Sequence, residues 1–224
     1  RKDPDEWQMI RRAVDCTHAM YQRARDIIEP GVSELEVFSQ LQTAAVEVAC
    51  EPLTGTGNDY RCGSPGGPPR SRLIESGELY ILDLGPAYRG YYADNCRTFA
   101  VNQCPTDAQQ SAWEQIVEVL EMVSRTVHPG VRCRDVFQEA QSMLDGYLPG
   151  AFSHHLGHGI GLFPHEGPHL NPNTGWNDTF EEGDVFTAEP GLYAPELRAG
   201  IRLEENYLVT SDGVEQLTRF PLEL

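Results

Sequence analysis

The chain has 224 residues, of which 40% are hydrophobic, and its 17 basic and 34 acidic side chains give a net charge of −17. So large a negative charge repels phosphate backbones and anionic lipids, which argues against nucleic-acid partners and membrane surfaces. The only lysine is Lys2, so a pyridoxal-phosphate Schiff base and a P-loop lysine are excluded as the chemistry of this chain.

The first part of the chain is expected to form two helices. Apolar residues recur at helical spacing over about residues 3–29, and Pro30-Gly31 is a strong signal for the end of a helix. The tetrapeptide S-E-L-E that begins at Ser33 has the capping-box pattern, which predicts the start of a second helix. This second helix is expected to run through about Cys50.

A loop and several strands are expected next. The stretch 55–72 is rich in Gly, Pro and Ser, which is typical of a loop. The β-rich run 79–82 predicts a strand that ends at Asp83, and residues 88–101 predict further strand, broken by Gly90.

The second half of the chain repeats the order of the first. Three matches occur in the same order in both halves: Pro30-Gly31-Val32 with Pro129-Gly130-Val131, Asp83 with Glu189, and Asp94 with Glu204. We interpret them as a duplicated helix–helix–strand unit, with pseudo-repeats over about 1–104 and 105–224. The two units are expected to close around a pseudo-two-fold axis.

Each half contributes two acidic residues from the ends of strands, Asp83 and Asp94 from the first, Glu189 and Glu204 from the second. Packed face to face, the halves would place four carboxylates in one cavity, where burial and mutual repulsion raise carboxyl pKa values. A pair of divalent cations is the natural compensation. The alternative is that these are solvated strand-end acids, but the apolar flanks in I-L-D-L-G and F-T-A-E-P-G favour burial.

Histidines are concentrated in one short segment of the second half. They are His154, His155, His158, His165 and His169. We interpret His155 and His169 as supporting or surface groups, and His18 and His128, outside the segment, as structural. Four carboxylates with one imidazole favour Mn²⁺, with Fe²⁺, Co²⁺ or Zn²⁺ possible. The residues alone therefore predict a two-metal hydrolase.

Six cysteines are scattered along the chain without a C-x-x-C pair. They are Cys16, Cys50, Cys62, Cys96, Cys104 and Cys133. This pattern is typical of reduced thiols and predicts a cytoplasmic protein.

An ordered set of motifs resembles a known family over nearly the whole chain. The motifs are D-L-G, D-N-C-R-T-F, G-H-G-I-G, F-P-H-E-G-P, F-T-A-E-P-G-L-Y and G-I-R-L-E-E. They resemble the M24 metallopeptidases, which include methionine aminopeptidase, aminopeptidase P, prolidase and creatinase. The resemblance implies the α+β pita-bread fold and a homodimer. The spacing from Glu189 to Glu204 is similar to the aminopeptidase P, prolidase and creatinase branch. That branch carries a smaller N-terminal domain, so we expect 1–224 to be the catalytic domain alone.

By position, the resemblance also implies a ligand set for two metal ions. Asp83 would chelate one metal, and Asp94 and Glu204 would bridge both. His158 and Glu189 would complete the second metal.

Further roles follow from the same resemblance. Glu189 would be the general base as well, and His165 would contact substrate and stabilise the tetrahedral intermediate. His154 matches a second active-site histidine of the proline-specific branch, and Arg202 matches an arginine beside the bridging glutamate.

The implied activity is hydrolysis of the bond between an N-terminal residue and proline in short peptides, by a metal-bridging hydroxide. One alternative is a divergent, creatinase-like hydrolase of another small amide. A second is a peptide-binding module of the same fold without catalysis.

Two departures from the family pattern affect the expected substrate. The family usually has an active-site histidine shortly before the first metal-binding aspartate, where this chain has Pro65 and Gly66. In addition, no Lys or Arg occurs in residues 159–197, where a strict prolidase would offer a cation to a dipeptide carboxylate. Loss of the histidine is expected to weaken stabilisation of the leaving group or intermediate, or to mark a different substrate. The missing cation argues against strict dipeptidase specificity.

Overall fold

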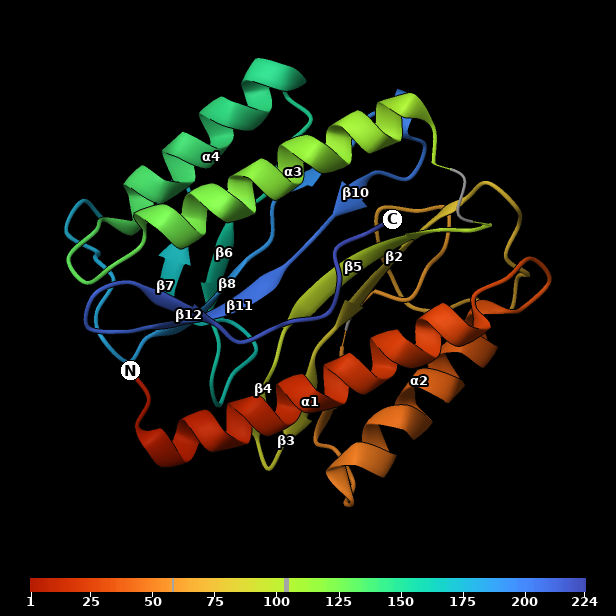
Figure 1. Ribbon diagram of the computed structural model, residues 1–224, viewed down its shortest axis with the longest axis horizontal. Helices are drawn as coiled ribbons and strands as arrows, with labels where there is room; N and C mark the ends of the chain where they lie inside the picture. The colour runs from red at the N-terminus through yellow and green to blue at the C-terminus, as the bar shows by residue number, and fades with distance from the viewer. Residues whose placement is uncertain (58, 103–104) are drawn as a thin grey trace.

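Two helix pairs flank a set of strands in the computed structural model, which describes residues 1–57, 59–102 and 105–224 (Figure 1). The helices are α1 (Pro4–Ile27), α2 (Glu34–Ala49), α3 (Asp107–Thr126) and α4 (Cys133–Tyr147). In the view of Figure 1, α1 and α2 lie along one edge of the molecule and α3 and α4 along the opposite edge. The strands lie between them.

Both helices of the first pair begin at capping residues that the sequence displays. Asp3 accepts hydrogen bonds from the backbone N–H groups of Asp5 and Glu6, and the Glu6 carboxylate accepts one from the Asp3 N–H at 2.8 Å. Ser33 caps α2 by accepting from the Glu36 N–H at 3.1 Å, which is one half of the predicted capping box. The helix ends at Cys50, whose φ of 57° is left-handed. Both predicted helices are confirmed.

The strands of the first half form two small antiparallel groups. They are β1 (Gly55–Thr56), β2 (Leu79–Leu84), β3 (Pro86–Tyr88), β4 (Tyr91–Tyr92) and β5 (Asn95–Ala100). β2 pairs with β5, while β3 pairs with both β1 and β4. The predicted break at Gly90 is confirmed, because β3 and β4 turn around it. The expectation of an uninterrupted loop from residue 55 is wrong at its start, since β1 pairs with β3 there.

The strands of the second half form a larger sheet. They are β6 (Gly157–Gly159), β7 (Glu166–Leu170), β8 (Val185–Ala188), β9 (Gly191–Leu192), β10 (Ile201–Arg202), β11 (Glu205–Val209) and β12 (Val214–Gln216), with a 3-10 turn at Pro195–Leu197. The sheet order is β12-β11-β8-β6-β7, all antiparallel, and β9 pairs separately with β10.

Each half thus contains a helix pair followed by an antiparallel strand pair, β2–β5 in one and β8–β11 in the other. The halves meet where β5 runs beside the start of β11. The Glu204 N–H donates to the Cys96 carbonyl at 3.0 Å, and Arg97 donates to the Glu204 carbonyl at 2.7 Å. Arg97 also forms a fully buried ion pair with Glu205 at 2.8 Å. This seam brings Asp94, directly before β5, next to Glu204, directly before β11.

The described cysteines form no disulfides, and Cys104 lies outside the described residues. Burial raises the pKa of the Cys16 thiol to about 11 and that of Cys133 to about 12, so both are neutral packing groups. Among the described residues, no helix has the length and apolar character needed to cross a membrane.

Candidate metal centre

The four predicted carboxylates lie together in the interior. Asp83 is on β2, Asp94 precedes β5, Glu189 follows β8 and Glu204 precedes β11, and none is more than 8% exposed. Within the described part of the chain, five of their buried oxygens have no hydrogen-bond partner. These oxygens are Asp83 Oδ1, Asp94 Oδ1, Glu189 Oε1, Glu204 Oε1 and Glu204 Oε2. An unpaired buried acceptor costs about 1–3 kcal/mol, so the cluster needs a cationic partner.

The spacing of these side chains suits two neighbouring cations. Ligand atoms of Asp83, Asp94 and Glu204 all lie within 4.8 Å of one another, and so do those of His158, Glu189 and Glu204. Glu204 belongs to both groups, and a carboxylate can bridge two metals through its two oxygens. The residues present therefore fit a dinuclear centre.

The pKa values of the carboxyl groups also indicate that the cluster needs a compensating positive charge. Burial raises the pKa of Asp83, and it raises the pKa values of Asp94 and Glu204 well above normal, with neighbouring carboxylates adding to the effect. Burial also acts on Glu189, but His158 and His155 outweigh it, and the pKa of Glu189 is lowered. Of the four carboxyl groups, Glu189 is thus the one whose pKa is lowered.

His158 is fixed in place by the tight packing of its strand. A Cβ atom on Gly157 or Gly159 would overlap the backbone of Thr187 or Gly167, so β6 must be glycine on both sides of the histidine. Nδ1 of His158 lies 3.1 Å from the Gly159 carbonyl. Nε2 lies 3.3 Å from Glu189, and with the proton on Nδ1 it would be the nitrogen able to bind a cation.

Other histidines surround this ligand. His165 stacks on His158 with ring centroids 3.6 Å apart, and His155 Nδ1 lies 3.3 Å from Glu189 Oε1. The Nδ1 atom of His154 pairs with the His155 carbonyl at 2.7 Å, leaving its buried Nε2 without a described partner. Burial lowers the pKa values of His154, His155 and His165. His155 is therefore beside the centre, whereas His169 is exposed.

A cavity of about 520 Å³ opens onto the cluster. Seven of the eight predicted site residues line it: Asp83, Asp94, His154, His158, His165, Glu189 and Arg202. Glu204 is the eighth and lies beneath them, 1% exposed. Five lining residues were not predicted: Asp59, Pro65, Ser153, His155 and Tyr193. Tyr193 belongs to the motif F-T-A-E-P-G-L-Y and could have been found there, whereas nothing in its sequence context marks Asp59.

Arg202 contacts carboxylates other than its sequence neighbour Glu204. Its Nη2 atom donates to Asp83 at 2.8 Å and to Asp59 at 2.5 Å, and its Nη1 atom donates to the Tyr193 hydroxyl at 2.9 Å. Asp59 in turn pairs with Asp83 through backbone hydrogen bonds of 3.1 and 3.3 Å. The arginine therefore links the loop before β2 to the carboxylate cluster.

Comparison with known proteins gives one consistent family. The sequence model of metallopeptidase family M24 matches residues 8–211. The Xaa-Pro dipeptidase of Pyrococcus horikoshii is 30% identical over 230 residues, covering 100% of this chain and 64% of that protein. The chain therefore spans about 64% of the length of this curated relative.

Solved structures agree with this result. The prolidase of Pyrococcus horikoshii superimposes with a TM-score of 0.90 at 29% identity, covering 100% of this chain and 64% of the other. The X-Pro aminopeptidase of Thermotoga maritima gives 0.88 at 27% identity, with coverages of 100% and 63%. These matches confirm the expected α+β pita-bread fold.

Proposed function

Because this chain belongs to metallopeptidase family M24, we propose that it hydrolyses the bond between an N-terminal residue and proline with two divalent cations. The observation that carries the proposal is the set of five unpaired carboxylate oxygens beneath one cavity. Relatives named Xaa-Pro dipeptidase, prolidase and X-Pro aminopeptidase support the substrate class. Residues 1–224 would form the catalytic domain, acting on short peptides as a homodimer.

The five predicted ligands would divide between two metals. Asp83 would hold one, His158 and Glu189 the other, and Asp94 and Glu204 would bridge both. Oxygen ligands with one imidazole suit Mn²⁺, with Co²⁺, Fe²⁺ or Zn²⁺ as alternatives. Such cations, when bound, lower the pKa of water and polarise a substrate carbonyl.

The chain's own residues would bind the peptide and move the protons. Glu189, kept ionised by its histidine neighbours, would accept a proton from the attacking water and pass it to the departing proline nitrogen. His165, at the cavity surface beside His158, would donate to the oxygen on which charge develops. His154 would orient the peptide, and Arg202 would orient the carboxylates that it bonds.

A creatinase-like activity on another small amide is the second candidate. It is favoured by the absence of histidine at Pro65 and Gly66, which changes one wall of the cavity. A non-catalytic binding module is less favoured, because all five ligand side chains are present and buried together.

Metal analysis followed by peptide assays tests the proposal. After dialysis against Mn²⁺, elemental analysis should find near two metals per chain, and the loaded protein should cleave Xaa-Pro peptides. Asp94→Ala should abolish both, whereas Asp26→Ala, at an exposed position on α1, should change neither. A metal content near zero in the folded wild type would contradict the proposal, and cleavage of other amides only would favour the second candidate.

A further inference from the structure

Asp59 occupies the space that a side chain at position 66 would need. A Cβ atom built on Gly66 would lie 2.5 to 2.7 Å from the three carboxylate atoms of Asp59. Gly66 is not among the glycines with positive φ, so a left-handed backbone is not what requires glycine there. Asp59 therefore excludes from position 66 the histidine that the sequence pattern leads us to expect at Pro65 or Gly66.

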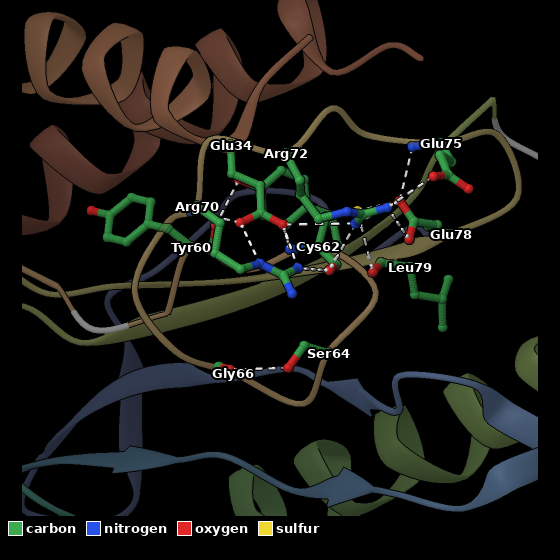
Figure 2. A network of polar contacts seen from close by, with 11 residues as sticks. Glu34, Tyr60, Cys62, Ser64, Gly66, Arg70, Arg72, Glu75, Glu78 and Leu79 are labelled. Carbon is green, nitrogen blue, oxygen red and sulfur yellow. Dashed lines mark hydrogen bonds and ion pairs between the residues drawn. The ribbon is translucent and has the colours of Figure 1, made fainter. Parts of the chain in front are cut away.

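The carboxylate of Asp59 is firmly held. One oxygen accepts from the Gly67 N–H at 2.6 Å, and the other accepts from Arg202 at 2.5 Å. The loop behind it is anchored by Glu34, which is completely buried and accepts from Arg70 at 2.6 Å and from the Cys62 N–H at 3.1 Å (Figure 2). A group fixed from both sides acts as a permanent part of the cavity wall.

Arg202 is thereby withheld from the substrate. Among the described residues that line the cavity it is the only Lys or Arg. Its Nη2 bonds the carboxylates of Asp59 and Asp83, its Nη1 bonds Tyr193, and its Nε is buried without a described hydrogen-bond partner. A substrate carboxylate would meet a guanidinium that is already neutralised, beside an additional negative group.

We propose that Asp59 is a specificity-determining residue that selects against a free carboxylate on proline. The site would then favour peptides that continue beyond proline, or that end in an amide, over Xaa-Pro dipeptides. This inference rests on the proposed function and names its substrate class more closely.

Two substrates that differ only in charge test the proposal. The metal-loaded wild type should cleave Ala-Pro-amide with a higher kcat/KM than Ala-Pro. In Asp59→Asn, which keeps the shape and removes the charge, the amide-to-acid ratio should fall about tenfold, as expected when a partly buried cation becomes available to a carboxylate. Asp178→Asn is the matched control, because Asp178 also accepts a glycine N–H, that of Gly175 at 2.9 Å, but lies outside the cavity. An equal ratio in Asp59→Asn and wild type would overturn the proposal.

A double-mutant cycle tests whether Asp59 blocks a side chain at position 66. Gly66→His alone should lower the thermal midpoint and the activity, because the new side chain collides with Asp59. The same change in an Asp59→Gly background should cost much less. Strictly additive effects would show that Asp59 does not determine what position 66 can hold.

Binding measurements separate this inference from the proposed function. If the loaded wild type cleaves neither substrate, the proposed function has failed. Calorimetry then measures the affinities for proline and prolinamide, and so the preference for acid or amide, without any cleavage. A rise in the relative affinity for proline in Asp59→Asn supports the inference, and an unchanged relative affinity overturns it.

Discussion

Replacing Asp94 by asparagine should have opposite effects on the metal-free and metal-loaded protein. Asp94 is 4% exposed, its Oδ1 atom has no described hydrogen-bond partner, and its neighbours Asp83 and Glu189 repel its charge. Without metal, Asp94→Asn removes a carboxyl group whose charged form is disfavoured by burial and by its neighbours, and it supplies two N–H donors to the cluster. With metal, it removes one of the two proposed bridging ligands.

The size of each effect follows from the contacts. An unpaired buried acceptor costs about 1–3 kcal/mol, so the metal-free variant should gain free energy of unfolding of about that size. For a chain of this length, 1 kcal/mol corresponds to about 2–4 °C in Tm. Metal present at about 100 times its Kd stabilises the wild type by about 2.7 kcal/mol. The variant should lose most of that gain.

Thermal unfolding with EDTA and with excess Mn²⁺ measures the effect of Asp94→Asn on the metal-free and the metal-loaded protein. The variant should melt above the wild type in EDTA and below it in Mn²⁺. Asp26→Asn, at an exposed site on α1, should follow the wild type in both. A variant that melts below the wild type in both conditions would refute the reasoning, because the carboxylates would then be compensated without metal.

Two further predictions concern stability without metal. Burial raises the pKa values of Asp94 and Glu204 in the folded state, so folded protein binds more protons than unfolded protein above about pH 4, the ordinary carboxyl range. The free energy of unfolding in EDTA should therefore fall as the pH rises above about 4, less steeply in Asp94→Asn, and equal slopes would contradict this assignment. Glu34→Gln should cost about 2 kcal/mol in urea unfolding, because buried Glu34 accepts four hydrogen bonds from Arg70 and Cys62. Glu36→Gln, at an exposed position, is the control. An equal loss of unfolding free energy in the two variants would contradict the anchoring role of Glu34.

Much of the centre was predictable because local signals and duplication agree. Helical spacing and caps give the helices, and the apolar residues before Asp83 and Glu189 mark strands whose ends must be buried. The repeated order of the halves then places two carboxylates opposite two others. No contact between the halves had to be known for that step.

The cavity wall was less predictable because it depends on contacts between distant segments. Asp59 lies in a Gly/Pro-rich loop, where the sequence has no periodicity from which the direction of a side chain could be predicted. Its place is set by a bridge to Asp83, by Arg202 and by the anchor at Glu34. Likewise, nothing in the sequence near Arg202 indicates that its side chain turns to Asp83 and Asp59 rather than to Glu204.

The seam between the halves argues that the metal centre is formed before metal binds. Arg97, its buried partner Glu205 and the Glu204–Cys96 backbone hydrogen bond join β5 to β11 without using any of the four clustered carboxylates. The backbone positions of Asp94 and Glu204 are therefore fixed by neutral and paired groups, and the strand pairs fix Asp83 and Glu189. Bound cations would then compensate the charge of the four carboxylates without changing the fold. Relief of the repulsion between these carboxylates would contribute to the affinity for the cations.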